Sequence, residues 1–362
     1  MKSVIGGRMS AKSSLSIVGT GSYLPGNAYS NDDLARVMET SDEWIQQRTG
    51  IAKRHYAPEG VGASDLALEA SKRALASAKL APEDIDYILF ATMTPDFILP
   101  GSAPVLGAKL GAVGVPALDI RQQCAAMIYA LQLADALLAT DNVSRILLVG
   151  AEAHAGFMPW TDWNLLDSAD GPPPSAAAWK RATDHRALAV LFGDGAGAWV
   201  LERDHRPDRG LLAVDLHADG NYATKLHIPA GFRTRPFVSQ KTVDEDLFIP
   251  RMEGKDVFKH AVTKLPKSVL RCCSRAGIKL TDVDLFVAHQ ANQRINESVR
   301  EALGVPVEKV PSNIARVGNT SAATIPILYD EIVRSGQVKE GMLICFLALG
   351  AGLHWGSALF RV

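Results

Sequence analysis

The sequence predicts an α/β fold made of two duplicated halves, with helices covering largely parallel β-sheets. Three observations support this prediction. Strand-like and helix-like patterns alternate along the 362 residues, as they do where helices connect parallel strands. Strand candidates such as YILFA and LICFLAL are apolar throughout, which indicates sheets covered on both faces. Segments of the first half recur in the second.

The individual elements follow from short apolar runs for strands and from longer helical periodicity for helices. In the first half we expect strands at 14–21, 86–93, 116–121, 145–151, 187–192 and 196–202, and helices at 31–39, 63–79, 101–111 and 124–140. In the second half we expect helices at 256–276, 292–303 and 321–335, and strands within DLFVA and LICFLAL.

The repeat has a constant offset. KLAPEDIDYILFAT, which contains Asp86, is echoed by IKLTDVDLFVAH, which contains Asp284, an offset of 284 − 86 = 198. RILLVG near residue 145 matches MLICFL near residue 342 at close to the same offset. Applied to Cys124, the offset gives a position just after Asn319, so these two residues are expected at similar places in the two halves.

The repeat also sets the expected domain boundaries. We predict a disordered tail at 1–14, an N-terminal half at 15–205 and a C-terminal half at 206–362. An inserted loop at 154–185 interrupts the first half, with three of the six tryptophans, a PPP run and no sustained periodicity. Loops of this length are often lids or binding loops, but this one could equally be a surface excursion whose tryptophans pack on the body.

Composition excludes several function classes. The formal net charge of −1 gives no basic excess for nucleic acid or an anionic membrane surface, and no apolar run reaches the ~18 residues of a membrane span. The four cysteines show neither metal-ligand spacing nor a disulfide framework, so we expect a reducing, cytoplasmic setting. FGDGAGAWVL does not fit the GxGxxG pattern, which argues against a dinucleotide site.

Cys124 follows the strand PALDIR and opens an apolar helix. A thiol at a helix N-terminus is favoured as thiolate, and we therefore expect its pKa to be lowered. The exposed N–H groups of the first turn, including that of Cys124, could also receive an oxyanion. Taken alone, the position fits a small buried structural residue better than a nucleophile. Cys272, Cys273 and Cys345 lie within apolar patterns and are assigned to packing.

His289 and Asn319 also sit where strands give way to turns. His289 ends the strand DLFVA, where it could donate a hydrogen bond to a thioester oxygen, or simply precede a helix capped by Asn292. Asn319 lies in Gly-Asn-Thr-Ser, where its carboxamide could hold a thioester carbonyl, although the same residues are ordinary turn chemistry. A thiol, an imidazole and a carboxamide together suit an enzyme that carries an acyl group on the thiol and stabilises an enolate.

Several long motifs occur in a fixed order. They are GTGSYLP (19–25), TSDEWIQQRTGI (40–51), FGDGAGA (192–198), HADGNY (217–222), HQAN (289–292), GNTSAA (318–323) and WGSALFRV (355–362). With Cys124, they resemble the ketoacyl-ACP synthase III family within the thiolase-fold condensing enzymes. The resemblance runs from about residue 15 to the end, apart from 154–185. It implies a thiolase-like fold with layered α-β-α-β-α architecture.

The resemblance also implies the chemistry and the site. Cys124 would take an acyl group from acyl-CoA, and His289 and Asn319 would promote decarboxylation of malonyl-ACP and hold the enolate that attacks the acyl-cysteine. The amides of Cys124 and Ala351 would form the oxyanion hole. The residues implied in substrate binding are Trp44, Arg48 and Arg186 for the CoA adenine, Arg294 and Lys259 for CoA phosphate or carrier docking, Met252 and Phe258 for the pantetheine tunnel, and Asn292 and Leu99. No permanently bound cofactor is implied, since the CoA thioester is a substrate.

Some residues depart from the family pattern. Arg121, Gln122 and Gln123 stand before the nucleophile where small residues are usual, and Met127 replaces an aromatic residue after it. These changes surround the expected acyl pocket and leave the acyl preference and the role of Arg121 open. Cys345 is five residues before Gly350, unlike the second cysteine of biosynthetic thiolases.

Three functional hypotheses follow. The first is decarboxylative Claisen condensation through acyl-Cys124, giving a 3-oxoacyl-ACP. The second keeps the acyl-enzyme but transfers the acyl group to a non-malonyl acceptor in specialised metabolism. The third, a non-catalytic acyl-binding subunit, is least favoured because all three polar site residues are present. The expected partners are acyl-CoA, malonyl acyl carrier protein and a second copy of the chain, with the FILPGSAP segment near the partner's acyl pocket.

Overall fold

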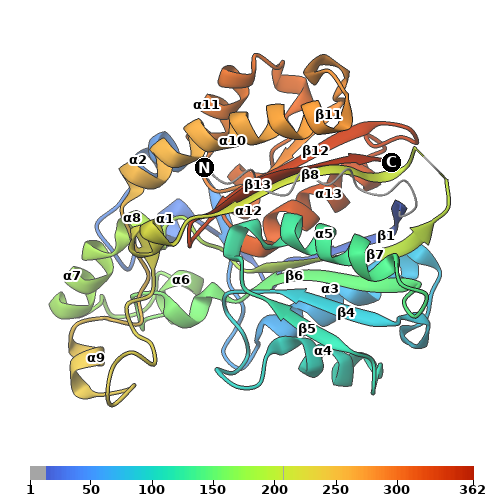
Figure 1. The fold of residues 1–362 in the computed structure, drawn as a ribbon. Coiled ribbons are helices and arrows are strands. Elements are labelled where there is room, and N and C mark those ends of the chain that lie inside the picture. The colour runs from blue at the N-terminus through green and yellow to red at the C-terminus, as the bar shows by residue number, and fades with distance from the viewer. Residues whose placement is uncertain (1–13, 207) are drawn as a thin grey trace.

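The computed structural model describes residues 14–206 and 208–362. The predicted disordered tail therefore lies outside the described residues, except for residue 14, which begins the first strand. Two large β-sheets and their covering helices form the body of the molecule (Figure 1). Among the described residues, no helix combines the length and apolarity needed to cross a membrane.

The first sheet contains five strands in the order β1-β7-β6-β4-β5. The strands are β1 (Ser14–Tyr23), β4 (Tyr87–Ala91), β5 (Ala117–Ile120), β6 (Arg145–Glu152) and β7 (Gly195–Asp204). β4 pairs in parallel with both β5 and β6, and β7 runs antiparallel to β6 and β1. The central strands of this sheet, β4 and β6, are buried along almost their whole length, as their apolar sequences predict.

The second sheet repeats this arrangement without the fifth strand, in the order β8-β13-β12-β11. The strands are β8 (Gly210–Ala218), β11 (Leu285–Ala288), β12 (Leu343–Gly350) and β13 (His354–Arg361). β11 and β12 are parallel, like β4 and β6, and start 198 residues after them (87 to 285, 145 to 343). The offset found in the sequence is therefore the offset between equivalent strands.

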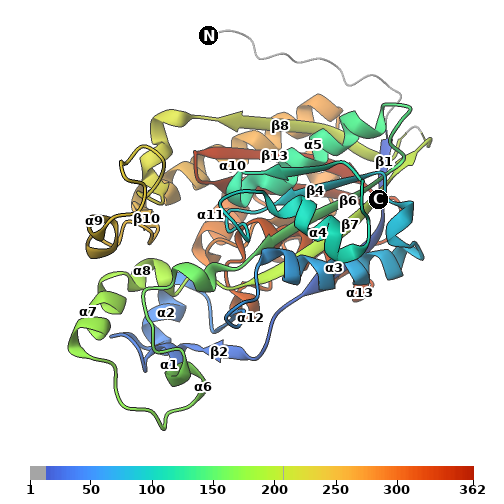
Figure 2. The ribbon, with the colours of Figure 1, turned by 90° about the horizontal axis from the view of Figure 1, so that it is seen from below.

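Helices form the other three layers. α5 (Ala126–Leu138) and α13 (Thr324–Arg334) lie between the two sheets (Figure 1), and their side chains join apolar side chains from both sheets in one core cluster. α3 (Ala63–Ala78) and α4 (Ser102–Leu110) cover the outer face of the first sheet, which is the side seen in Figure 2. α10 (Gly254–Ala276) and α11 (Gln293–Leu303) lie beyond the second sheet. This is the predicted α-β-α-β-α layering.

Two short 3-10 turns precede the central helices, and they are equivalent in the two halves. They are η2 (Gln123–Ala125) before α5 and η7 (Ser321–Ala323) before α13. The first residue of each turn has a positive φ, 51° at Gln123 and 46° at Ser321, and these positions are again 198 apart. A non-glycine residue seldom adopts this conformation, and such positions cluster at functional sites. The duplicated turns bring Cys124 and Asn319 toward each other.

One predicted strand is wrong. Residues 187–192 do not form a strand; the chain there forms a short helix, α8 (Arg186–Ala189), and then an irregular segment that precedes β7. The segment begins Ala-Leu-Ala, which favours helix, and Val190 is its one β-branched residue. A short apolar run of this kind fits either state by pattern alone.

The remaining elements are small. The helices are α1 (Asn31–Leu34), α2 (Asp42–Thr49), α6 (Asn164–Asp167), α7 (Ala176–Asp184), α9 (Gln240–Asp244) and α12 (Ile314–Val317), and α1 is shorter than the predicted helix 31–39. The strands are β2 (Ala28–Ser30), β3 (Lys53–His55), β9 (Leu226–His227) and β10 (Arg251–Met252). The 3-10 turns are η1 (Pro82–Asp84), η3 (His154–Phe157), η4 (Gly220–Lys225), η5 (Leu280–Asp282) and η6 (Val307–Lys309).

The segment 154–185 packs against the body through its tryptophans. Trp160 is buried and meets Tyr56 edge-on, with ring centroids 5.8 Å apart. Trp163 also meets Tyr56, at 5.3 Å. Aromatic edge-to-face contacts of this kind stabilise packing beyond simple burial. The geometry favours the surface-excursion interpretation for these two tryptophans.

Candidate active site

One cavity of about 450 Å³ is lined by Cys124, His289 and Asn319. Cys124 lies in η2, His289 directly after β11, and Asn319 just before η7. Cys124 and His289 therefore follow the ends of strands, where α/β sheets commonly place ligand-binding residues. Contrary to the expectation from the sequence, Asn319 does not follow a strand but comes after the short helix α12. The structure brings together the three residues selected from the sequence.

The thiol of Cys124 is buried and neutral. It is 7% exposed, and its Sγ lies 3.3 Å from Ser321 Oγ. Burial raises the pKa of Cys124 to about 12, the nearby carboxylate of Glu152 adds to the rise, and the Ser321 hydrogen bond opposes it. The expectation of a lowered thiol pKa is therefore wrong for the resting protein. α5 begins only at Ala126, and desolvation of the thiolate outweighs the other effects.

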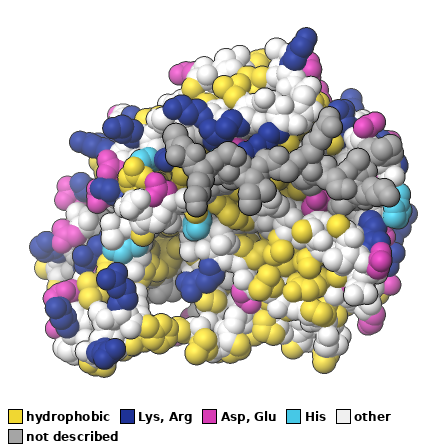
Figure 3. Space-filling model, viewed as in Figure 1, with side chains coloured by type: hydrophobic (Ala, Val, Ile, Leu, Met, Phe, Trp, Pro, Cys, Tyr) yellow, Lys and Arg dark blue, Asp and Glu magenta, His cyan; other side chains and the backbone are white. Residues whose placement is uncertain are grey.

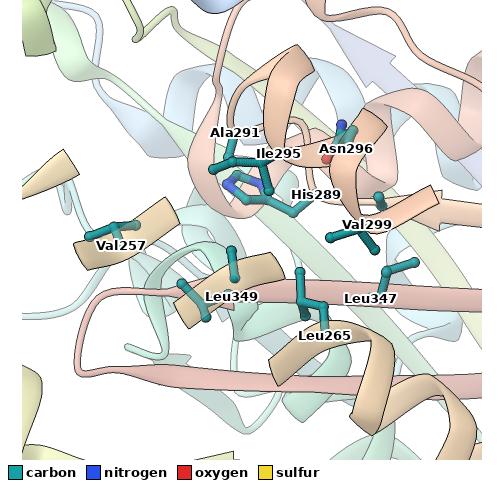
Figure 4. Close-up of a pocket in the computed structure, with 11 residues that line it drawn as sticks. Val257, Leu265, His289, Ala291, Ile295, Asn296, Val299, Leu347 and Leu349 are labelled. Carbon is teal, nitrogen blue, oxygen red and sulfur yellow. The ribbon is translucent and has the colours of Figure 1, made fainter. Parts of the chain in front are cut away.

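His289 is also neutral. Its ring lies among apolar side chains from α10, α11 and β12, including Val257, Ile295 and Leu349 (Figure 4). Burial lowers the pKa of His289 to about 3, so the imidazole carries no charge at pH 7. The ring is therefore suited to donating or accepting a hydrogen bond rather than to acting as a cation.

Thr324 orients this imidazole. His289 Nδ1 lies 2.6 Å from Thr324 Oγ1, and that hydroxyl is also 3.0 Å from the carbonyl oxygen of Ser321. A threonine hydroxyl has one proton to donate. Thr324 donates that proton to the carbonyl oxygen of Ser321, so its own oxygen accepts a hydrogen bond from Nδ1–H of His289. When the hydroxyl turns its proton to Nδ1 instead, the imidazole proton resides on Nε2, which is the tautomer that can donate a hydrogen bond to a substrate oxygen.

Asn319 is held by its backbone and by its side-chain oxygen. Its N–H donates to Leu191 O, and its carbonyl accepts from Gly193 N–H, which fixes it beside the segment after α8. Its Oδ1 accepts a hydrogen bond of 2.8 Å from the N–H of Ser321. Because the oxygen is engaged, the NH₂ group is the part of the carboxamide available to a ligand.

The glycine-rich segment after β12 lies directly against the nucleophile. A Cβ atom at Gly350 would lie 2.9 Å from the backbone N of Cys124 and 3.2 Å from its Cβ. Only glycine fits such a close approach without a shift. The next residue, Ala351, lines a second cavity together with Cys124. The predicted oxyanion pair, the amides of Cys124 and Ala351, thus belongs to adjoining segments at one cavity.

The residues expected to contact adenine also meet. The guanidinium carbon of Arg48 lies 4.3 Å from the ring centroid of Trp44, and that of Arg186 lies 4.9 Å from it. Asn292, which lines the Cys124 cavity and caps α11, donates a hydrogen bond to the carbonyl of Arg48. This contact links the Trp44 cluster to the residues of the cavity.

The other expected binding residues divide into two groups. Met252, Phe258 and Arg294 line the cavity with the three polar residues. Lys259 is exposed on α10 and Leu99 is 82% exposed, and neither lines a described cavity.

Sequence reasoning missed three contributors. Lys255 lines the cavity one helical turn before Lys259, and the helix periodicity of α10 could have indicated it. Ser321 and Thr324, which form hydrogen bonds with Cys124 and His289 respectively, follow Asn319 by two and five positions. Applying the repeat offset to Gln123 would have selected Ser321, but nothing in the pattern pointed to Thr324.

A second cavity of about 530 Å³ shares Cys124, Phe192 and Leu226 with the first. Arg121 lines it and is exposed. Burial raises the pKa of Asp119, and the positive charge of Arg121 opposes that rise only in part. Cys124 therefore lies where two cavities adjoin, one containing His289 and Asn319 and one on the side of Ala351.

The sheet order, the central helices and the position of this cysteine define a thiolase-like fold with a cysteine-centred site. Residues 118–171 and 175–220 match 3-Oxoacyl-[acyl-carrier-protein (ACP)] synthase III, and residues 273–362 match the C-terminal part of the same family. The chain belongs to the 3-oxoacyl-[acyl-carrier-protein] synthase III family. The enzyme class expected from the sequence is thereby confirmed.

Individual relatives extend over nearly the whole chain. Beta-ketoacyl-[acyl-carrier-protein] synthase III of Bordetella petrii is 41% identical over 351 residues, covering 96% of this chain and 97% of that protein. Its counterpart in Caldanaerobacter subterraneus is 40% identical over 353 residues, covering 98% and 99%. Among solved structures, the synthase III of Aquifex aeolicus superposes with a TM-score of 0.82 at 37% identity, covering 97% of this chain and 100% of that chain. A priming beta-ketosynthase of a polyketide pathway also gives 0.82, at 29% identity and 97% coverage of both chains.

Proposed function

We propose that this protein condenses an acyl-CoA with malonyl acyl carrier protein through an acyl group held on Cys124, releasing CO₂ and a 3-oxoacyl carrier protein. The observation that carries the proposal is the shared cavity of Cys124, His289 and Asn319. The names of the relatives, which are ketoacyl carrier-protein synthases, support the same reaction.

In the first half-reaction, the sulfur of Cys124 attacks the thioester carbon of acyl-CoA. The N–H groups of Cys124 and Ala351 stabilise the oxyanion that forms. The bond to the CoA sulfur then breaks, and CoA leaves as a thiol with the proton that Cys124 gave up. Because the resting thiol is neutral, the proton must move as the attack occurs.

In the second half-reaction, the malonyl thioester replaces CoA. His289 and the NH₂ group of Asn319 donate hydrogen bonds to its carbonyl oxygen, so that an enolate forms as CO₂ leaves. The enolate carbon attacks the acyl-Cys124 carbonyl and expels the thiolate, which takes up one proton from solvent. Loss of CO₂ supplies the electron pair, so no base has to remove a proton from carbon. A neutral imidazole suits this role because it donates without transferring its proton.

The CoA and carrier sites form part of the proposal. Trp44 with its two flanking guanidinium groups offers a face for a purine ring, since arginine and indole both stack on planar groups. Arg294 and Lys255 on the cavity wall and Lys259 on the outer surface of α10 would meet phosphate groups of CoA or of a carrier-bound arm. The substrate thioester is the sole coenzyme required.

We further propose that the protein acts as a homodimer in the cytoplasm. β5 is an edge strand, and Leu118 on it is 41% exposed. Val113, before β5, is 83% exposed, and Leu99 is 82% exposed. Figure 3 shows apolar side chains gathered over the region of β5 and α4. An exposed edge strand with apolar neighbours is suited to pairing with another sheet. The four free cysteines accord with a reducing compartment.

The direct test follows both half-reactions by mass spectrometry. Wild-type protein mixed with acyl-CoA should gain one acyl group on Cys124, and subsequent malonyl carrier protein should yield a product longer by two carbons. Cys124→Ala should gain no acyl group, whereas Cys273→Ala, which alters a buried cysteine outside the cavity, should gain it normally. Covalent loading of the Cys124→Ala variant would refute the proposal. Acyl transfer to another acceptor without two-carbon extension would favour the acyltransferase hypothesis instead.

A further inference from the structure

Condensation of a short acyl group does not explain the size and the lining residues of the second cavity. Its volume of about 530 Å³ falls within the range of sites for drug-sized ligands, and a two-carbon acyl group would leave most of it unfilled. If the first cavity receives the thioester arms, the acyl chain on Cys124 must extend into the second. This placement of the acyl chain rests on the function proposed above.

One wall of this cavity is apolar and aromatic. Phe232 and Phe237 stack with ring centroids 4.7 Å apart, and Phe248 meets Phe237 edge-on. Met93 and Ile98 add aliphatic surface. These side chains suit a chain of several methylene groups, each of which gains about 0.8 kcal/mol when it leaves water.

Three basic side chains line the same cavity: Arg121, His227 and His354. The Nδ1 atoms of both histidines are buried and have no hydrogen-bond partner among the described residues. The structure likewise records no ion pair or hydrogen bond from the guanidinium of Arg121 within the described part of the chain. None of the described residues that line the cavity is Asp or Glu.

This combination is chemically selective. A buried polar atom without a partner costs about 1–3 kcal/mol, which a ligand recovers when it supplies the hydrogen bond. A guanidinium matches the two oxygens of a carboxylate, and an imidazole N–H can donate to either oxygen. An acyl chain with an apolar end would leave the Nδ1 atoms of both imidazoles without a partner and would make no use of the Arg121 guanidinium, which is exposed and acts electrostatically on Asp119.

We propose that the acyl group preferred by Cys124 ends in a carboxylate, so that the donor substrate is the mono-CoA thioester of a dicarboxylic acid with an aliphatic spacer. The transfer is the same as in the proposed function. The thioester bond to CoA breaks, the new bond to Cys124 Sγ forms, and the proton of the thiol leaves with CoA. The free carboxylate takes no part in bond making and is bound by Arg121 and the two histidines.

The test compares two donors of equal length, adipyl-CoA and hexanoyl-CoA, on the full-length protein. The measured quantity is the initial rate at which each acyl group appears on Cys124 by intact-mass spectrometry. Wild-type protein should load adipyl at least tenfold faster than hexanoyl. In Arg121→Gln this ratio should fall at least tenfold, and Arg121→Lys should restore part of it. In Lys72→Gln, an exposed cation on α3, the ratio should stay at the wild-type value.

The outcomes separate this inference from the proposed function. Loading of hexanoyl at a rate equal to or above that of adipyl in wild-type protein overturns the dicarboxylate preference and leaves the condensing function intact. An unchanged ratio in Arg121→Gln overturns the assignment of Arg121. The wild-type ratio needs no variant, so it decides the question even where a variant fails to fold. If neither acyl group appears on Cys124, the proposed function and this inference are refuted together.

Discussion

The ionisation of Cys124 gives the most detailed prediction. Burial raises its pKa to about 12, whereas a free cysteine has a pKa near 8.5. At pH 7 about 3% of a free thiol is ionised, against about 0.001% of Cys124, a deficit of roughly 3,000-fold. A thiolate of higher pKa is more nucleophilic, with a Brønsted coefficient of about 0.4–0.5, which recovers roughly 40-fold. Cys124 should therefore react with iodoacetamide roughly a hundredfold more slowly than glutathione at pH 7.

The pH dependence of this alkylation distinguishes ionisation from restricted access. The logarithm of the rate should rise with a slope near one from pH 7 to at least pH 10, while that of glutathione levels off above its own pKa. Restricted access alone would lower the rate by the same factor at every pH, so the rate would still level off near the ordinary thiol pKa of about 8.5. Peptide mapping against Cys124→Ala assigns the modified site. A plateau below pH 10, or alkylation faster than that of glutathione at pH 7, would refute the neutral-thiol description.

Three further predictions concern the surroundings of the site. Gly350→Ala places a methyl group 2.9 Å from the Cys124 backbone and should slow acylation at least a hundredfold. The control Gly156→Ala, whose methyl group meets nothing within 4 Å, should have little effect. Equal acylation rates in the two variants would contradict the close packing of Gly350 on Cys124. Thr324→Val removes the hydroxyl 2.6 Å from His289 and should slow condensation by roughly 5- to 150-fold while sparing acylation, as half-reaction kinetics would show; loss of acylation alone would argue against this orienting role. In the unfolded protein His289 binds a proton below pH 6.5, whereas in the native protein it does so only near pH 3. The free energy of unfolding should therefore fall by up to about 5 kcal/mol as the pH is lowered from 6.5 to 3. Denaturant titration should show a smaller fall for the His289→Gln variant.

Much of the architecture could be predicted because it depends on local pattern and on the repeat. The offset of 198 fixed equivalent strands in the two halves and related the turn of Cys124 to the turn that follows Asn319. Long apolar strands and helices with clear periodicity were located to within a few residues. The short run at 187–192 was not, because six apolar residues carry too little periodicity to distinguish helix from strand.

The details of the site could not be predicted because they arise where the two halves meet. The raised pKa of Cys124 results from tertiary burial, which overrides the local effect of a helix N-terminus. The contact between His289 and Thr324 joins the end of β11 to α13. Likewise, His227 and His354 lie on β9 and β13, and only the folded chain places them with Arg121 around one cavity.

The central claim is that Cys124 carries the acyl group while His289 serves the carbon–carbon bond-forming step. Its most direct measurement is a chase: protein first loaded with an acyl group receives malonyl carrier protein, and the mass of the protein is followed with time. Wild-type protein should lose the adduct as fast as the 3-oxoacyl product appears, and His289→Ala should load at a similar rate but retain the adduct. A His289→Ala variant that discharges its acyl group into product at the wild-type rate would contradict the account.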